Sequence, residues 1–319
     1  MKKYKTILSF FLTAFLFYFL LKDLDMVLFR EYLFEGRSLL ILSGVFFYLL
    51  SFAVRGLRWK LLTSHIGDFK VGELTMLTIS GYAVNNIMPV RIGEFARAWV
   101  TGNRRKVSKT SVLASIFVER VFDGLTIAFL LFVILFIYPL PPNVKTLALL
   151  AFSFFMLLFL FIMFGTFSKI PEKILFSIRK KFKVLSFFVD VAEKFISGAS
   201  SIKSPKAFFA VTFLSFFVWS MELVVYILIS RAFGVEIPLV GYIFMLCAAN
   251  LGMLAAPTPG GLAVFQAAIV YSLRFFAILY EKRMAVAVVL HMSQIIPVTI
   301  LGLLWLWYHQ ISLSMIEKE

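Results

Sequence analysis

The sequence predicts an all-α fold, a polytopic bundle of transmembrane helices that forms a single domain over residues 1–319. Hydrophobic residues make up 61% of the chain and charged residues 15%, whereas a soluble domain has about 45–50% and about 25%. Phe alone occurs 39 times. The apolar runs lack the period-two alternation of an outer-membrane barrel. Because a helix satisfies its own backbone hydrogen bonds in lipid, the runs are expected to be helical.

The apolar runs alternate with basic loops, and the longer runs approach the roughly 20 residues that a spanning helix needs. Cytoplasmic loops carry an excess of Lys and Arg, so the N-terminal lysines and the basic loop over 55–70 are expected to face the cytoplasm. Tracing the spans from there places the C-terminus in the cytoplasm as well. This pattern predicts a multi-pass protein of the cytoplasmic (inner) cell membrane. The runs lie at 6–21, 38–54, 74–88, 111–138, 146–165, 207–230, 239–256, 262–280 and 284–308.

The run at 74–88 is predicted to be part of a re-entrant hairpin over about 74–110. A block of six Lys and Arg residues follows it at 91–109, and a full crossing would place this block outside, against the positive-inside rule. Pro89 removes a backbone donor and disfavours a helical Met88. We therefore expect the segment to break near Pro89 and to return to the cytoplasmic side.

The long basic segment at about 168–206 is predicted to be cytoplasmic. Its apolar residues recur at helical spacing between lysines and arginines. An amphipathic helix lying on anionic lipid fits this pattern. The alternative is a solvated linker helix that packs on the spans.

A second broken hairpin is predicted over about 239–280, where Pro257, Pro259, Gly260 and Gly261 interrupt the apolar sequence. The topology brings this hairpin in from the face opposite the first one. Two broken hairpins of opposite entry are typical of an inverted repeat, in which the broken ends meet near the midplane. The sequence similarity between the two halves is weak, so the repeat is a hypothesis.

Polar residues within the apolar runs are candidate functional residues, because a charge at mid-bilayer costs roughly 2.5–3.5 kcal/mol on insertion scales. Arg55 and Arg58 share a helix face next to Trp59. Their guanidinium groups suit a lipid phosphate. Snorkelling beside an aromatic belt is the alternative.

A second polar cluster accompanies the first break. If a helix restarts after it, Arg91, Glu94 and Arg97 form one stripe of alternating charge. Such a stripe beside broken helix ends could bind an anionic headgroup; a structural ion pair in a loop is the alternative. The amides and breaker residues of this cluster are Asn85, Asn86, Pro89 and Gly93.

The third cluster is Glu119, Arg120 and Asp123, within the run 111–138. These residues could form a polar pathway or hold a proton-linked carboxylate, and they could pair with Arg91 or Arg97. The alternative is a charged helix start at the cytoplasmic surface.

The fourth cluster accompanies the second break, where glycines permit backbone geometry that other residues avoid. Its amides could line a cavity for an anion, and a plain kink is the alternative. We interpret Glu222 and His291, which are lone polar residues in their spans, as satisfied packing groups. The members of the fourth cluster are Asn250, Pro257, Thr258, Pro259, Gly260, Gly261 and Gln266.

Several function classes are disfavoured by the sequence. The net charge of +15 gathers in loops between apolar runs, which is typical of a membrane protein and not of a nucleic-acid-binding one. Cys247 is the only cysteine and the three histidines are far apart, so no disulfide and no metal site are expected. No nucleotide-binding GxxxxGK[ST] motif is present, and no cofactor is expected.

Four motifs, taken in their order along the chain, resemble those of the lysylphosphatidylglycerol synthase transmembrane region family, also called the flippase-like family. The resemblance covers nearly the whole chain. They are Arg55-x-x-Arg58-Trp59, Asn86-x-x-Pro89-x-Arg91-x-Gly93-Glu94-x-x-Arg97, Glu119-Arg120-x-x-Asp123 and Pro257-Thr258-Pro259-Gly260-Gly261. The resemblance implies about eight transmembrane segments with re-entrant helices. It also implies movement of a phospholipid, such as an aminoacylated phosphatidylglycerol, between leaflets.

Two features set this chain apart from the family pattern. Relatives with synthase activity carry a soluble C-terminal aminoacyl-transferase domain, which these 319 residues lack, so we expect no synthase activity here. The family usually has Gly and Glu where this chain has Ala263 and Gln266. A cationic lysyl headgroup would need that acid, whereas a neutral or anionic lipid would not.

The leading hypothesis is therefore a lipid flippase, not an enzyme, whose partners are membrane phospholipids. Arg91, Arg97 and Arg58 would hold the phosphate, while nearby carboxylates orient the arginines or the headgroup. One alternative is a membrane-embedded enzyme on a lipid-linked substrate, with Glu119 and Asp123 as acid and base. Another is a noncatalytic partner that recruits a separate lipid synthase or glycosyltransferase. A homo-oligomer is left open.

Overall fold

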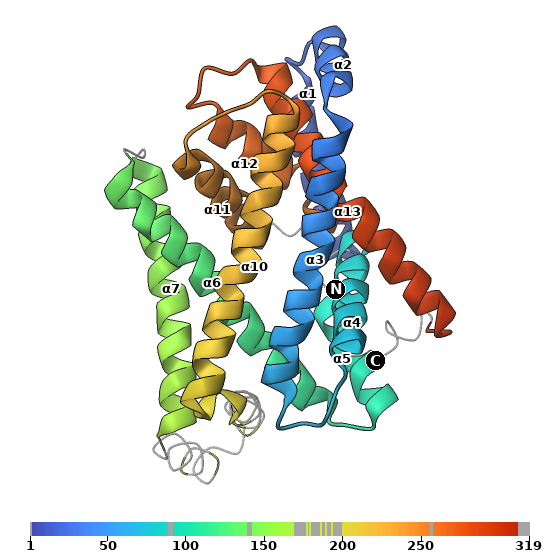
Figure 1. Cartoon of the computed structure of the whole chain (residues 1–319), viewed down its shortest axis with the longest axis vertical. Helices are drawn as coiled ribbons and strands as arrows, with labels where there is room; N and C mark the ends of the chain where they lie inside the picture. The colour runs from blue at the N-terminus through green and yellow to red at the C-terminus, as the bar shows by residue number, and fades with distance from the viewer. Residues whose placement is uncertain are drawn as a thin grey trace.

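The structure is a computed structural model that describes residues 2–88, 92–138, 142–168, 177, 179, 186, 189, 193, 200–255 and 258–311. The described residues form helices and connecting loops (Figure 1). The helices are α1 (Lys2–Leu21), α2 (Met26–Glu35), α3 (Ser38–Thr63), α4 (Val71–Ile87), α5 (Gly93–Arg105), α6 (Lys109–Ile137), α7 (Pro142–Phe167), α10 (Pro205–Ala232), α11 (Leu239–Ala255), α12 (Val264–Leu273) and α13 (Tyr280–Tyr308), with short 3-10 helices η2 (Ser200–Lys203) and η3 (Pro259–Gly261).

Five of these helices are long and apolar enough to cross a membrane: α3, α6, α7 from Val144, α10 and α13. Large apolar side chains on their outer faces are exposed, such as Phe154 and Leu157 on α7 and Phe213 on α10. Lipid is the solvent that such a surface requires. The predicted all-α transmembrane bundle is confirmed, and α1 together with two broken hairpins brings the described membrane segments to the predicted number of about eight.

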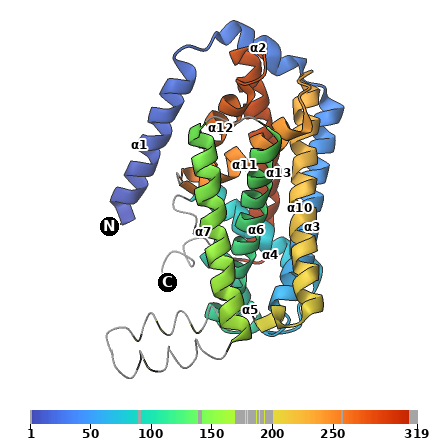
Figure 2. The same ribbon diagram turned by 90° about the vertical axis from the view of Figure 1, so that its left-hand side faces the viewer.

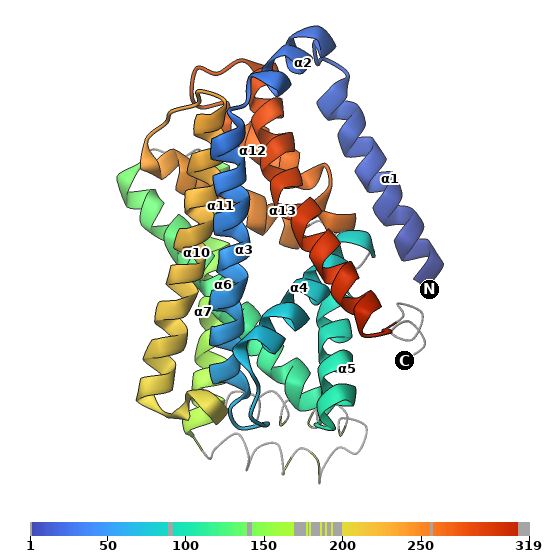
Figure 3. The same ribbon diagram turned by 45° about the vertical axis from the view of Figure 1, so that its right-hand side comes forward.

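The long helices pack side by side, with α3 between α10 and α4, and α13 against α4. Helix α1 stands apart from the bundle in Figure 2 and touches it through α12 and η3. The N-terminal end of α1 and the C-terminal end of α13 point toward the same end of the molecule as the C-terminal end of α3 (Figure 3). Their cytoplasmic location stays a prediction.

The first broken hairpin consists of α4 and α5, which have 17 and 13 residues and are shorter than a typical span of about 20. Asn85 stabilises the break, because its Oδ1 accepts a hydrogen bond from the Gly93 backbone N–H at 2.7 Å. Gly93 also lets the two helices touch, since a Cβ there would lie 2.0 Å from the Gly81 carbonyl oxygen. The hairpin covers 71–105, close to the predicted 74–110.

The second broken hairpin consists of α11, η3 and α12, and it enters from the opposite end of the bundle (Figure 3). Gly260 and Gly261 have φ values of 58° and 75°, which glycine adopts at little cost. An added Cβ at Gly260 would lie 3.1 Å from the Asn86 carbonyl oxygen. The two hairpin tips therefore meet inside the molecule, as predicted; the inverted repeat itself stays a prediction.

Some predicted features lie outside the described residues. One is the amphipathic character of 168–206, of which residue 168, residues 200–206 and five isolated positions are described. The others are Pro89, Arg91 and Pro257.

Candidate functional site

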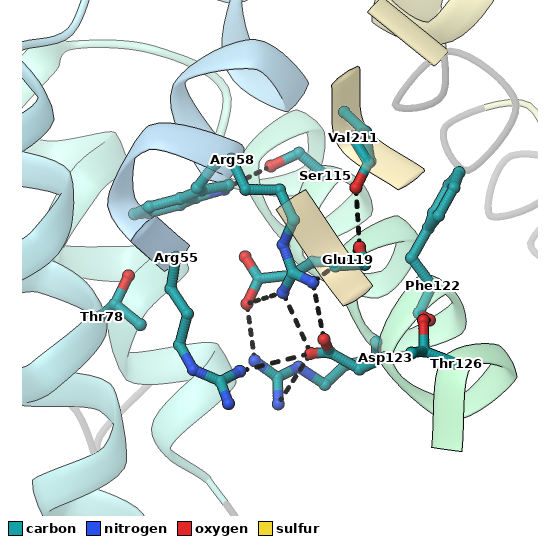
Figure 4. A network of polar contacts seen from close by, with 12 residues as sticks. Arg55, Arg58, Thr78, Ser115, Glu119, Phe122, Asp123, Thr126 and Val211 are labelled. Atoms are coloured by element: carbon teal, nitrogen blue, oxygen red, sulfur yellow. Dashed lines mark hydrogen bonds and ion pairs between the residues drawn. The ribbon is translucent and has the colours of Figure 1, made fainter. Parts of the chain in front are cut away.

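A network of charged side chains lies at mid-height in the bundle. Asp123 is the central residue of the 29-residue helix α6, and Glu119 lies one turn before it. Both are buried, as are Arg55, Arg58 and Arg97. Figure 4 shows Arg55 and Arg58 of α3 reaching toward the two carboxylates of α6. A charged helix start at the surface is therefore the wrong interpretation of the third cluster.

Asp123 is held mainly by Arg58. The two guanidinium nitrogens Nη1 and Nη2 donate to its carboxylate oxygens at 2.7 and 3.1 Å. Trp219 of α10 adds an indole N–H at 3.1 Å. Arg58 Nη1 also donates to the Ser215 hydroxyl at 2.9 Å. Because a planar fork matches a carboxylate, this arrangement fixes α3, α6 and α10 against one another.

Glu119 receives Arg97 from the first hairpin, at 3.2 and 2.9 Å to its two oxygens. Arg120 Nη2 donates to the same carboxylate at 2.6 Å. The Arg97 guanidinium lies over the Trp59 ring, 3.4 Å from its centroid. Trp59 is fully buried and donates to Ser115 at 3.0 Å, so snorkelling beside an aromatic belt is the wrong interpretation of the first cluster. The predicted pairing with Arg97 is confirmed for Glu119, whereas Asp123 pairs with Arg58.

Glu222 of α10 belongs to the network, although the sequence had suggested an ordinary packing group. Its carboxylate accepts a hydrogen bond from Arg55 of α3 and it is 6% exposed. A buried arginine at a helix position this deep needs a carboxylate partner. Glu222 is the only acid in α10. This isolated acid in an apolar helix is the feature of the sequence that could have indicated its place in the network.

The network and the cavity beside it contain four arginines and four carboxylates, because Glu94 lines the cavity in addition to the three paired acids. Arg55, Arg58, Arg97 and Arg120 face the carboxylates of Glu119, Asp123 and Glu222. Several buried guanidinium N–H groups have no hydrogen-bond acceptor among the described residues, including Nε and Nη1 of Arg55 and Nε of Arg120. Buried donors of this kind are costly unless something accepts from them.

A cavity of about 500 Å³ lies beside the network, between the hairpin tips and the long helices. Its charged wall consists of Arg55, Glu94, Arg120, Asp123 and Glu222. Tyr82, whose hydroxyl accepts from Arg120 at 3.0 Å, lines it as well. The cavity is therefore a polar chamber beside the charged network, near the middle of helix α6.

The cavity wall continues to the outside of the bundle. Phe95 of α5 and Leu254 of α11 line the cavity, yet their side chains are 60% and 51% exposed. In a membrane-embedded bundle the exposed side of such residues contacts acyl chains. The cavity is thus bounded here by apolar residues that also contact lipid.

The second hairpin contributes His291 and its partners. The imidazole Nε2 lies 3.0 Å from the Gly260 carbonyl oxygen, and Nδ1 lies 3.0 Å from the Gln266 Nε2. Since a carbonyl only accepts and an amide N–H₂ only donates, Nε2 carries the proton and the imidazole is neutral. Phe265 stacks on the ring with centroids 4.2 Å apart. Gln266 therefore positions His291 and does not itself line the cavity.

The structure brings most predicted site residues to this place. Those that line the cavity are Arg55, Asn85, Asn86, Glu94, Arg120, Asp123, Asn250, Thr258, Gly260 and Gly261. Arg58, Arg97 and Glu119 lie behind them in the network. Lining residues that the sequence did not single out as functional include Tyr48, Tyr82, Trp219, Glu222, His291 and Gln294.

Comparison with known proteins agrees with this architecture. The profile of the lysylphosphatidylglycerol synthase TM region family matches residues 6–302. The chain belongs to this family. The four motifs that carried the resemblance thus led to the correct family.

Two curated proteins are similar to this member of the family. Glycosyltransferase AglD of Haloferax volcanii is 26% identical over 301 residues, which are 84% of this chain and 48% of AglD. The chain therefore spans about half the length of that relative. UPF0104 membrane protein MJ1078 of Methanocaldococcus jannaschii is 24% identical over 222 residues, which are 69% of this chain and 91% of that protein.

Proposed function

We propose that this protein moves an anionic phospholipid between the leaflets of the membrane, with the lipid phosphate bound by Arg55 and Arg120. One observation carries the proposal: Arg55 and Arg120 are the arginines of the network that line the cavity, where a guanidinium group can donate hydrogen bonds to a ligand. A phosphate supplies oxygens that accept such bonds, and charge-assisted bonds of this kind are the strong ones.

The two cavity arginines differ from the other two in how they are held. Arg55 donates one hydrogen bond to Glu222, and Arg120 donates one to Glu119. Arg58 and Arg97 already hold carboxylates through two bonds each. Their role in this proposal is therefore to position the acids, whereas the sequence had assigned them to the phosphate.

Entry from the side explains how a lipid reaches a site at this depth. The headgroup would enter past Phe95 and Leu254, whose side chains border both the cavity and the lipid, while the acyl chains stay in the bilayer. The two hairpin tips meet beside this site. Broken helices that enter from opposite faces and meet at a central site are a recurrent arrangement for alternating access.

Binding is tested by native mass spectrometry of the purified protein with phosphatidylglycerol. We expect the wild type to retain the lipid and Arg120→Gln to lose most of it. Arg30→Gln is the matched control, because Arg30 is exposed on α2, away from the cavity. Equal retention by all three proteins would contradict a phosphate site at Arg120.

The similarity to AglD, which is named a glycosyltransferase, supports a second candidate, a membrane-embedded enzyme; the lipid-linked substrate is the hypothesis drawn from the sequence. Glu119 and Asp123, the acid and base of that hypothesis, are both engaged by arginines, which disfavours proton transfer by either one. Mass spectrometry of lipids after incubation with the protein tests this candidate. A covalently changed lipid would favour it, and an unchanged lipid pool would favour transport.

A further inference from the structure

We propose that the protein has a second anion site, which binds a phosphate group at one end of the bundle, outside the central cavity. The site is a pocket of about 480 Å³ where α4 begins and where α5 and α13 end. Among the described residues it shares no lining residue with the central cavity, and the inference does not depend on the proposed function. Its lining residues include Gly72, Glu73, Arg104, Arg105, Trp305 and His309.

Arg104 is the cation that this pocket leaves available for a ligand. It lies in the last turn of α5 and is exposed, and its guanidinium carbon lies 5.3 Å from the centroid of the Trp305 ring. In the part of the chain that the structure describes, no carboxylate lies within ion-pair distance of it. A guanidinium group that no acid occupies suits the oxygens of a phosphate.

The one acid among the described lining residues is already paired. Arg105 donates its Nε to Glu73 Oε1 at 2.9 Å and makes a second hydrogen bond from Nη2 to Oε2. The Glu73 side chain is 16% exposed, whereas that of Arg105 is 40% exposed. The pair therefore presents its cation to solvent more than its carboxylate. Two arginines face one acid in this pocket, which favours an anionic ligand.

His309 adds a neutral hydrogen-bond donor to the pocket. It is the C-cap of α13, and its ring meets the Trp305 ring edge-on with the centroids 4.4 Å apart. Partial burial and the charge of Arg104 lower the pKa of His309, against the opposite effect of Glu73. At neutral pH the imidazole is therefore uncharged and carries one N–H. A phosphate oxygen can accept that bond together with those of Arg104.

The pocket lies at the level of a membrane surface. Trp307 and Tyr308, which directly precede His309, are 78% and 76% exposed. Exposed Trp and Tyr at the end of a spanning helix mark the level of the lipid headgroups. This end of the molecule (Figure 3) is the one predicted to face the cytoplasm. A lipid phosphate and a soluble phosphate both have access at this level, and either one would join α5 of the first hairpin to α13.

The inference is tested by the unfolding temperature of the purified protein in detergent, because a ligand that binds the folded state raises it. The probes are inorganic phosphate and dihexanoyl phosphatidic acid, each compared with chloride at equal ionic strength. We expect a saturable rise with at least one phosphate probe and none with chloride. A rise with inorganic phosphate means that the phosphate group alone is recognised, and a rise with the lipid alone means that the ligand is a membrane lipid. No rise with either probe would overturn the inference.

Two variants locate the rise in this pocket. Arg104→Gln should weaken the affinity at least about tenfold. Gly72→Leu should weaken it similarly with every charge in place, because a Cβ at Gly72 meets nothing within 4 Å and a larger side chain there fills part of the pocket. Gly72→Ala is the matched control and should bind as the wild type does. Unchanged affinity in both Arg104→Gln and Gly72→Leu would overturn the inference.

Arg120→Gln separates this site from the central cavity. The rise that Arg104→Gln removes should persist in Arg120→Gln. A rise that is lost in Arg120→Gln and kept in Arg104→Gln would assign the binding to the cavity and overturn the inference. A cooperative transition without ligand verifies that each variant is folded. The proposed function is judged by lipid movement, which does not enter this test, so either proposal can fail alone.

Discussion

Arg58 and Asp123, on helices α3 and α6, are joined by two hydrogen bonds of 2.7 and 3.1 Å at the centre of the bundle. Neither residue lies at the surface: the Arg58 side chain is fully buried and that of Asp123 is 6% exposed. In low-dielectric surroundings such a pair depends on both partners. It also fixes the helix on which Arg120 projects into the cavity.

Replacement of Arg58 by Met should destabilise the fold by roughly 3–5 kcal/mol. Asp123 would keep the Trp219 indole as a donor, while Arg55 and Arg120 stay 3.7 Å from it. Unfolding in detergent measures this loss. The double variant Arg58→Met with Asp123→Leu should recover much of the stability, because no carboxylate is left unpaired. A double variant as unstable as the single one would contradict the pairing.

Gly93→Ala should separate the two helices of the first hairpin. The new Cβ would lie 2.0 Å from the Gly81 carbonyl oxygen and 2.7 Å from the Asn85 side chain, so backbone must move. We expect a lower unfolding temperature. Gly72→Ala, on the same hairpin, meets nothing within 4 Å and should be neutral or slightly stabilising. Equal effects of the two substitutions would contradict the close approach of α4 and α5.

Ala263→Gly should stabilise the protein by about 1 kcal/mol. Ala263 precedes α12 with a φ of 66°, a conformation that Cβ disfavours. Ala248→Gly is the matched control, since Ala248 lies inside α11. This variant should lose roughly 0.5–1 kcal/mol of folding stability. Unfolding temperatures of the two variants should therefore shift in opposite directions, and a fall for both would contradict the strain at Ala263.

The sequence predicts those parts of this fold that depend on local chemistry. The breaks after Ile87 and Ala255 follow from proline and glycine, whose backbone preferences act within a few residues. The helices follow from apolar runs of spanning length. Ala263 also illustrates this: its φ of 66° is a backbone conformation that glycine adopts at little cost.

Contacts between distant segments could not be read from the sequence. Arg55 and Glu222 are 167 positions apart, and no periodicity links them. The sequence indicated that nearby carboxylates orient Arg58 and Arg97, but not which acid holds which arginine. Gln294 gave no signal, because a single amide in an apolar helix acquires its meaning only from the cavity that it faces.

The central claim is that Arg120 and Arg55 bind the phosphate of a moving lipid, and leaflet exchange tests it most directly. Labelled phosphatidylglycerol in the outer leaflet of proteoliposomes is bleached, and the protected fraction is followed over time. Arg120→Gln leaves the Arg58–Asp123, Arg97–Glu119 and Arg55–Glu222 pairs in place, so the fold should persist.

We predict fast exchange for the wild type and for Arg30→Gln, and a loss of at least about tenfold for Arg120→Gln, since a lost charged hydrogen bond is worth about 1.5–3 kcal/mol. Exchange by folded Arg120→Gln at the wild-type rate would contradict the account.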